Sequence, residues 1–174
     1  MAIDKVTSAS ITTDAVGPTQ LNEASNYAFT GTVTGTPANT PNMYAKLSSD
    51  QTISNNTTTT IAFASEIYDT ANAYNNSTYL FTAPSAGKYV CHIHLRYNDA
   101  QSNRNAITLY INSDSSNQYS FEQSPGNVFS TSGGMGILNL SANDTVQWKY
   151  YQSSGGNIVV RSADSYMGIF KLSE

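Results

Sequence analysis

The chain has 174 residues, of which 11% are charged, and its net charge is −4. This length suits one domain with a sizeable core, and the low, acidic charge excludes the concentrated basic face that nucleic-acid binding needs. No window approaches the roughly 18 apolar residues of a membrane span, and a lone Cys91 excludes an internal disulfide. We therefore expect neither nucleic acid nor a membrane as a partner. Abundant Ser, Thr, Asn and Tyr favour strands over helices.

Residues 1–42 differ from the rest of the chain, because small and β-branched residues alternate there with scattered Gly and show no strong apolar periodicity. Only Tyr27, Phe29 and Val33 share one face of a short strand, which is too thin to fold alone. The segment also lacks the apolar core of a signal peptide, which argues against classical secretion. We predict either a flexible tail or an attachment arm that orders only against a partner or its own copies, ending in a Pro-containing linker. The candidate attachment residues are Ile11, Val16, Leu21, Tyr27, Phe29 and Val33.

From residue 43 to residue 174 the pattern is all-β. Residues 43–47 predict a short strand, residues 48–60 a polar excursion, residues 60–68 a second apolar stretch, and residues 69–77 an Asn-rich loop.

The stretch from residue 79 to residue 97 carries the clearest signal. An apolar run leads into a corner at Pro84 and Gly87, and then a strictly alternating strand begins. Because side chains on a strand alternate between its two sides, one face of this strand should be buried and the other should meet another subunit or water. The first face holds Tyr89, Cys91, Ile93, Leu95 and Tyr97, and the second holds Val90, His92, His94 and Arg96.

After a polar turn at residues 98–105, residues 106–113 predict a strand with Ile107, Leu109 and Ile111 inward, and residues 118–123 a short amphipathic one. Residues 133–151 read as a Gly-rich turn followed by two strands, which an Asn-Asp turn joins as a hairpin. Strands at residues 158–162 and 165–172 close the chain. Eight to ten antiparallel strands without a helix predict an all-β sandwich of the jelly-roll type.

Three blocks in this order carry a family likeness. The first contains Phe63, Tyr74, Phe81-Thr82-Ala83-Pro84, Gly87 and Tyr89, followed by His92-Ile93-His94-Leu95; the second Leu138-Asn139-Leu140 and Asp144-Thr145-Val146; the third Ser165 to Phe170. They resemble the globular head of complement C1q, a relative of the tumour necrosis factor (TNF) jelly roll. The chain departs from that pattern at Tyr79 and Asn143, where the family has Gly, and at Cys91, where it has Phe. It also lacks the collagen-like stalk of the animal family, which argues against an animal complement-type role.

The resemblance implies a homotrimer around a threefold axis. Abundant Tyr and Phe fit burial between subunits, although a Tyr-rich face in water is the alternative. We assign the trimer interface or the core to Phe81, Tyr89, Ile93, Leu95, Tyr97, Tyr166 and Phe170.

The N-terminal segment has a likeness of its own, because its Thr-Asp-Ala-Val and Asn-Tyr-x-Phe-Thr-Gly-Thr-Val elements resemble units of bacteriophage virion fibres. This resemblance implies a structural protein of the virion surface. We predict a trimeric capsid decoration or cement-type protein whose arm binds the major capsid protein or another virion component. The alternatives are a tail-fibre adhesin that recognises host surface glycan, with exposed Tyr and Trp148 stacking on sugars, and a secreted C1q-like recognition protein.

No motif for catalysis or for a cofactor stands out. His92 and His94, two apart on one strand face, could chelate a metal, or they could simply line an interface. The family resemblance also makes Asp99 and Asp114 conceivable calcium ligands, but no calcium-loop spacing is present. Cys91 reads as a small buried apolar residue without a base beside it. We therefore predict no enzyme and no cofactor, with calcium as the alternative.

Overall fold

The computed structural model describes residues 41–98, 104–123 and 129–173. The predicted attachment residues Ile11, Val16, Leu21, Tyr27, Phe29 and Val33 lie outside the described residues, as does Asp99. The predicted arm and its boundary with the head therefore stay predictions. No helix in the described ranges is long and apolar enough to cross a membrane.

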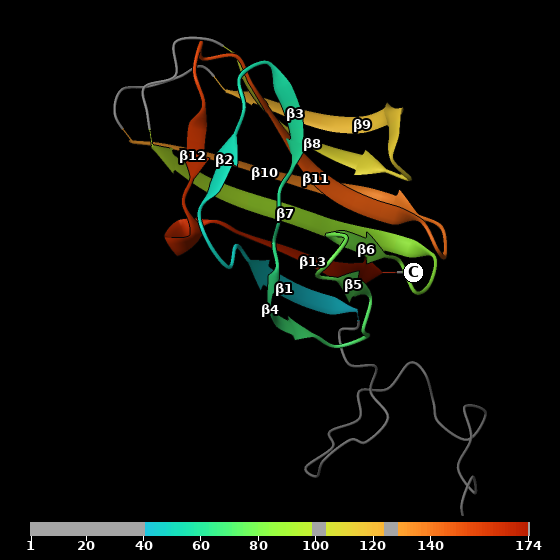
Figure 1. The fold of residues 1–174 in the computed structure, drawn as a ribbon. Coiled ribbons are helices and arrows are strands. Elements are labelled where there is room, and N and C mark those ends of the chain that lie inside the picture. Colours follow the sequence, from blue (N-terminus) through green and yellow to red (C-terminus); the bar gives the residue numbers. More distant parts are fainter. Residues whose placement is uncertain (1–40, 99–103, 124–128, 174) are drawn as a thin grey trace, which may run out of the picture. The chain divides into compact units, whose positions relative to one another are not determined.

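Two antiparallel sheets make up the described part of the chain (Figure 1). Sheet A contains β1 (Asn42–Lys46), β2 (Gln51–Ile53), β4 (Ser65–Asp69), β7 (Gly87–Asn98), β10 (Phe129–Leu140), β12 (Ile158–Val160) and β13 (Tyr166–Ser173). Sheet B contains β3 (Thr57–Thr60), β5 (Tyr74–Asn75), β6 (Leu80–Thr82), β8 (Asn105–Ile111), β9 (Asp114–Gln123) and β11 (Thr145–Gln152). The predicted all-β jelly roll is confirmed. Eight of these strands have five residues or more, and five shorter ones raise the total above the predicted number.

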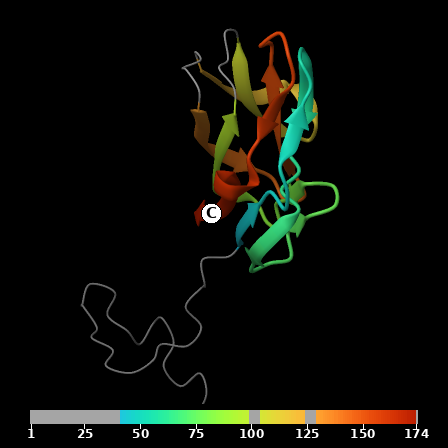
Figure 2. The ribbon, with the colours of Figure 1, turned by 60° about the vertical axis from the view of Figure 1, so that its left-hand side comes forward.

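The long strand β7 is the centre of Sheet A. It pairs with β10 along its whole length on one side, and with β13 and β12 on the other. The central strand of Sheet B is β11, which pairs with β8 on one side and with β3 and β6 on the other. The two sheets stack as two layers (Figure 2).

The inward faces of these strands form one hydrophobic core. The alternating face of β7 is buried as its pattern predicts, with Tyr89, Cys91 and Leu95 fully enclosed. Sheet B contributes the inward residues of β8 and of β11, including Trp148, which is only 2% exposed. Trp148 therefore cannot stack on a sugar, and that part of the glycan expectation is wrong. Burying each large apolar side chain stabilises the fold by about 1.5–3 kcal/mol.

Two corners carry the chain from one sheet to the other at the same end of the head. Between β6 and β7 the corner contains Ala83, and between β10 and β11 it contains Asn143 and Asp144. The backbone amide of Asn143 donates to the carbonyl oxygen of Ala83 at 2.8 Å, and that of Ala83 donates to Asp144 O at 2.8 Å. The two crossings therefore hold each other in place.

The predicted hairpin across Asn143 and Asp144 is wrong, because β10 and β11 lie in different sheets. Asn143 does adopt the left-handed conformation expected of a tight turn, with φ 71°. A tight turn does form at Asn143, but a local turn signal does not determine which sheet contains the next strand.

Strands also lie in three segments where the sequence predicts none. The expected excursion at residues 48–60 contains β2 and β3, and the expected loop at residues 69–77 contains β5. The Gly-rich turn expected at residues 133–136 lies inside β10. There Gly134 leaves room for the Phe121 ring, which a Cβ at residue 134 would meet at 2.5 Å. These Gly residues serve close packing of strands rather than a change of direction.

Candidate functional site

The outward side of Sheet A carries a group of aromatic, apolar and histidine side chains. We call it the outer face of Sheet A and define it by Tyr44, Tyr68, Val90, His92, His94, Met135, Ile137, Tyr166, Gly168 and Phe170. It follows from strand alternation: each inward core residue of β7 and β13 leaves its neighbour facing outward.

A row of aromatic rings crosses this face over four strands. The rings of Tyr68 and Tyr44 stack with centroids 6.0 Å apart, Tyr44 meets Tyr166 at 5.6 Å, and Tyr166 stacks on His94 at 5.2 Å. Burial and the neighbouring phenols raise the pKa of Tyr44, which keeps its hydroxyl neutral near pH 7. The row is a preformed aromatic surface.

The two histidines are part of this packing. The ring of His92 lies over Gly168 and touches the edge of Tyr166, with centroids 6.1 Å apart. Burial lowers the pKa of His92, which favours the neutral ring. His94 Nδ1 lies 2.8 Å from the carbonyl oxygen of Asp164, and because a carbonyl only accepts, Nδ1 carries the proton.

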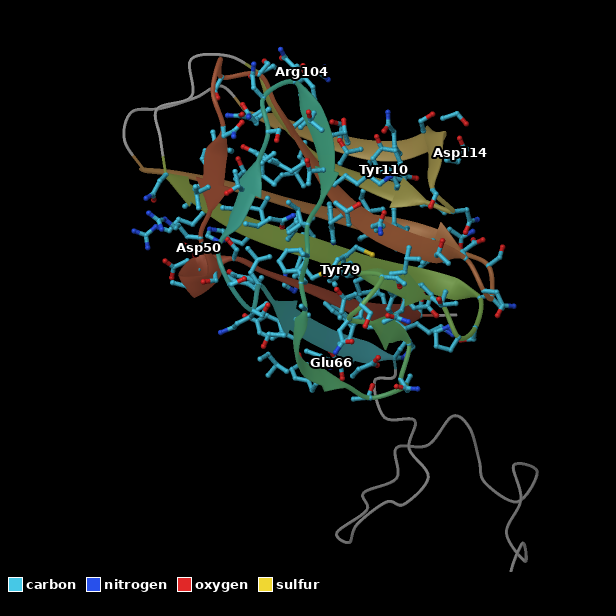
Figure 3. All side chains as sticks on the ribbon, in the orientation of Figure 1. Asp50, Glu66, Tyr79, Arg104, Tyr110 and Asp114 are labelled. Atoms are coloured by element: carbon cyan, nitrogen blue, oxygen red, sulfur yellow. The ribbon has the colours of Figure 1, made fainter. Side chains whose placement is uncertain are left out.

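Within the described ranges no group of three or more His, Cys, Asp or Glu side chains could hold a metal ion. Asp114, at the start of β9, accepts hydrogen bonds from the backbone and hydroxyl of Ser116, both at 2.8 Å. These bonds lower the pKa of Asp114 and form its own turn. Asp114 and Glu66 lie on opposite sides of the head (Figure 3).

Apolar side chains on β10 extend the aromatic row towards the edge of Sheet A. Met135 is 66% exposed and Ile137 is 59% exposed, and they stand opposite His92 and Val90 of β7. Sequence reasoning missed both residues because the surrounding Gly residues were read as a turn. Their two-residue spacing was the signal that could have placed them on one face of a strand.

Charge lies around this surface rather than within its centre. The charged outward residues of β7 are Lys88 and Arg96, and each lies near one end of the strand. Arg96 forms an ion pair with Asp164, and Lys46 places its Nζ atom 5.7 Å from the Tyr44 ring centroid. The centre is thus suited to contact another uncharged surface.

The outward side of Sheet B has the opposite character. Lys149 Nζ sits 4.3 Å from the ring centroid of Tyr110, and the Arg104 guanidinium lies 5.5 Å from that of Tyr151. Hydroxyl and amide groups lie beside these pairs, as in the 3.3 Å hydrogen bond from Thr60 to Gln147. Such a surface is well solvated, so the two sides of the sandwich are chemically distinct.

The residues assigned from sequence to the interface or core divide between the two faces. Tyr166 and Phe170 lie on the outer face of Sheet A. The others are at most 3% exposed and lie in the core: Phe81, Tyr89, Ile93, Leu95 and Tyr97.

The family model of the C1q domain matches residues 43–168. The chain belongs to the C1q domain family. No curated protein matches the sequence. The predicted likeness to the C1q head is confirmed over most of the chain.

Solved structures agree with this assignment at the level of the fold. The globular domain of zebrafish complement 1qA is 16% identical with a TM-score of 0.56, and the match covers 77% of this chain and 98% of that one. The TNF protein Eiger from S. frugiperda is 14% identical with a TM-score of 0.54, covering 76% and 91%. Murine APRIL at pH 8.0 is 9% identical with a TM-score of 0.57, covering 75% and 98%. This C1q domain therefore has the jelly roll shared by C1q and TNF proteins.

Proposed function

We propose that this protein is a non-enzymatic homotrimer of C1q domains that pack through the outer face of Sheet A, and that residues 1–42 attach it to a phage capsid as a decoration protein. The observation that carries the trimer is the uncharged aromatic and apolar surface around His92, Tyr166, Met135 and Ile137. C1q and TNF domains typically act by binding rather than catalysis, and a homotrimer is consistent with the family.

Physical chemistry favours covering this surface. Exposed apolar patches on soluble proteins mark interaction sites, and burial contributes roughly 25 cal/mol per Å² of apolar area. The aromatic row adds flat, rigid rings that lose little side-chain entropy on contact. A closed ring of identical subunits covers such a patch on every copy at once.

The virion assignment rests on the N-terminal segment. Its resemblance to phage fibre elements supports an attachment role, and three arms on one trimer would multiply weak contacts with a symmetric capsid site. The virion surface is accordingly the proposed location, and the major capsid protein or another virion component the proposed partner.

A recognition protein is the second candidate, either as a tail-fibre adhesin for surface glycan or as a secreted C1q-like protein. The polar, tyrosine-bearing outward side of Sheet B favours it, because a trimer that covers Sheet A leaves this side facing solvent. Imaging of labelled particles separates the candidates: labelling over the capsid supports decoration, labelling at tail tips supports the adhesin, and unlabelled particles contradict both virion roles.

The trimer is tested by light scattering coupled to size-exclusion chromatography. The wild-type protein should have about three times the chain mass of 18.7 kDa. Ile137→Glu should give a folded monomer, because it places three carboxylates in the interface while the side chain is already 59% exposed in the single domain. Thr58→Glu, an exposed residue of Sheet B, is the matched control and should remain trimeric. A monomeric wild-type protein, or an Ile137→Glu trimer, would contradict the proposal.

Attachment is tested with a variant that lacks residues 1–40. This boundary keeps Pro41, whose carbonyl oxygen accepts from Lys171, and Asn42, whose amide donates to Thr70 Oγ1 at 2.9 Å. The shortened protein should remain a folded trimer and no longer bind particles. Retained particle binding would show that the arm is not the attachment segment.

A further inference from the structure

We propose that the head carries a second binding site, a pocket for a neutral saccharide of one or two sugar units. It is an open pocket of about 610 Å³ and lies where the loop after β4 meets the two corners between the sheets. We call it the amide pocket and define it by Glu66, Asn72, Asn76, Thr82, Pro84 and Asn143. None of these residues belongs to the outer face of Sheet A, so the pocket goes beyond the trimer proposal and does not depend on it.

Both walls of the amide pocket are held in shape by the protein itself. On the loop side, Asp69 accepts from the backbone amides of Ala71 at 3.1 Å and Tyr74 at 2.7 Å. Asn75 Oδ1 accepts from the amides of Ser77 and Thr78 at 2.9 and 3.0 Å. The facing wall is the pair of interlocked corners described above, which includes the backbone of Asn143. A site with preformed walls loses little entropy when a ligand binds.

A bulge in β4 places Glu66 at the pocket. The register slips between Tyr44 and Ala45, so that Tyr68 stands opposite Tyr44 while Glu66 stands opposite Ala45. Ala45 faces the core and is fully buried. Tyr68 and Glu66 therefore face opposite sides of Sheet A, although residues two apart in a regular strand face the same side. Bulges commonly re-aim one side chain in this way beside functional sites.

Three Asn side chains of the amide pocket make no hydrogen bond to the protein. In the described part of the chain, the amides of Asn72, Asn76 and Asn143 and the carboxylate of Glu66 have no side-chain hydrogen-bond partner. Asn72 and Asn143 also hold left-handed backbones, with φ 50° and 71°, where Gly would fit with less strain. Asn tolerates this conformation better than most residues do, and the side-chain amides of Asn72 and Asn143 remain available to a ligand.

The chemistry of the lining selects the ligand class. Each amide both donates and accepts, as a sugar hydroxyl does, and Glu66 adds a strong acceptor. Anionic ligands are disfavoured because the lining holds a carboxylate and no Lys or Arg. Small apolar groups from Ala73 and Pro84 complete it and suit the C–H face of a pyranose. The volume lies within the usual range for small-ligand sites.

The experiment titrates the full-length protein with glucose, galactose, mannose, N-acetylglucosamine and their β-1,4-linked disaccharides, followed by amide chemical shifts. At least one sugar should shift the amide resonances of residues 66–77, 82, 83 and 143 and leave those of β7 and β13 in place. Asn72→Gly and Asn143→Gly remove one amide each while accommodating the local φ. Each should weaken binding about tenfold, as for the loss of one or two hydrogen bonds.

Asn157→Ala is the matched control, because Asn157 is an exposed residue outside the pocket, and it should bind like the wild type. Absence of binding across the panel, shifts mapped elsewhere, or binding that survives both Gly variants would overturn the proposal. Because the shift map uses the wild-type protein, the test holds even if a variant fails to fold.

Discussion

The imidazole ring of His92 lies directly over Gly168 of the neighbouring strand β13, leaving no room for a Cβ on residue 168. The two residues are paired in the register of β7 and β13. This contact lets the His92 ring lie flat enough to reach Tyr166, so a missing side chain on one strand positions an aromatic ring on the next. It also yields a test of how the outer face of Sheet A is built.

Gly168→Ala should lower the free energy of unfolding by about 1–3 kcal/mol, the usual cost of overpacking, because the new methyl group must displace the His92 ring. Urea unfolding followed by the fluorescence of Trp148 measures the change. In the double variant His92→Ala/Gly168→Ala the ring is absent, so the added methyl should cost much less. Equal costs of Gly168→Ala with and without the ring would show that the clash lies elsewhere.

Acidification should weaken the assembly through His92. Burial lowers the pKa of His92 in the folded protein below the unfolded value of 6.5, so the unfolded chain binds the proton first. The stabilisation is fully present above pH 6.5 and is lost as the pH falls towards and through the folded pKa. The side chains that face it are those of Tyr166, Tyr44 and Met135. A trimer interface over His92 would strengthen the effect.

The measurement is the urea midpoint, together with the trimer dissociation constant, at pH 8 and pH 5. In the wild type the urea midpoint should fall and the dissociation constant should rise at pH 5. Both changes should be smaller in His92→Gln, whose side chain is polar but does not titrate. A pH response that His92→Gln leaves unchanged would assign the effect to other groups.

The sequence allowed the fold to be predicted where local pattern and tertiary position agree. The strict alternation of Tyr89 to Tyr97 assigned the buried face of β7, and the resemblance around Phe81 and Gly87 identified the jelly roll. It did not reveal that the chain crosses between sheets after Leu140, because sheet pairing is a long-range choice. The exposed Met135 and Ile137 were missed for a related reason: Gly within a strand reads locally as a turn until a bulky neighbour such as Phe121 is known.

The thiol of Cys91 should be unreactive towards thiol reagents in the native protein. It is fully enclosed in the core, and burial raises the pKa of its thiol to about 12, so almost no thiolate forms near pH 8. A disulfide reagent such as dithionitrobenzoate should react slowly with the native protein and at once with the urea-unfolded chain. Cys91→Ser should lower stability by about 1–3 kcal/mol because it buries a hydroxyl, whereas Cys91→Ala should cost less. Rapid labelling of the native protein would contradict this account of β7.

Gln152, the last residue of β11, is fully buried and joins β11 to β2 and to the turn that follows β11. Its Nε2 group donates to the carbonyl oxygens of Ile53 at 3.1 Å and Gly156 at 2.9 Å, and its Oε1 accepts from the amide and hydroxyl of Ser154 at 2.8 and 2.7 Å. Gln152→Glu keeps the shape of the side chain and replaces both donors with acceptors.

The buried carbonyl oxygen of Ile53 would then lose this donor, and an unsatisfied buried group costs about 1–3 kcal/mol. The Gly156 oxygen is only partly buried and also lies 3.0 Å from Ser154 Oγ. We therefore expect a larger loss of stability for Gln152→Glu than for Gln152→Met, with both measured by urea unfolding at pH 8. Protonation of the new carboxyl would restore one donor, so the deficit of Gln152→Glu should narrow on acidification to pH 5, while that of Gln152→Met should not. If both variants matched the wild type, the bonds to Ile53 and Gly156 would not hold the turn after β11.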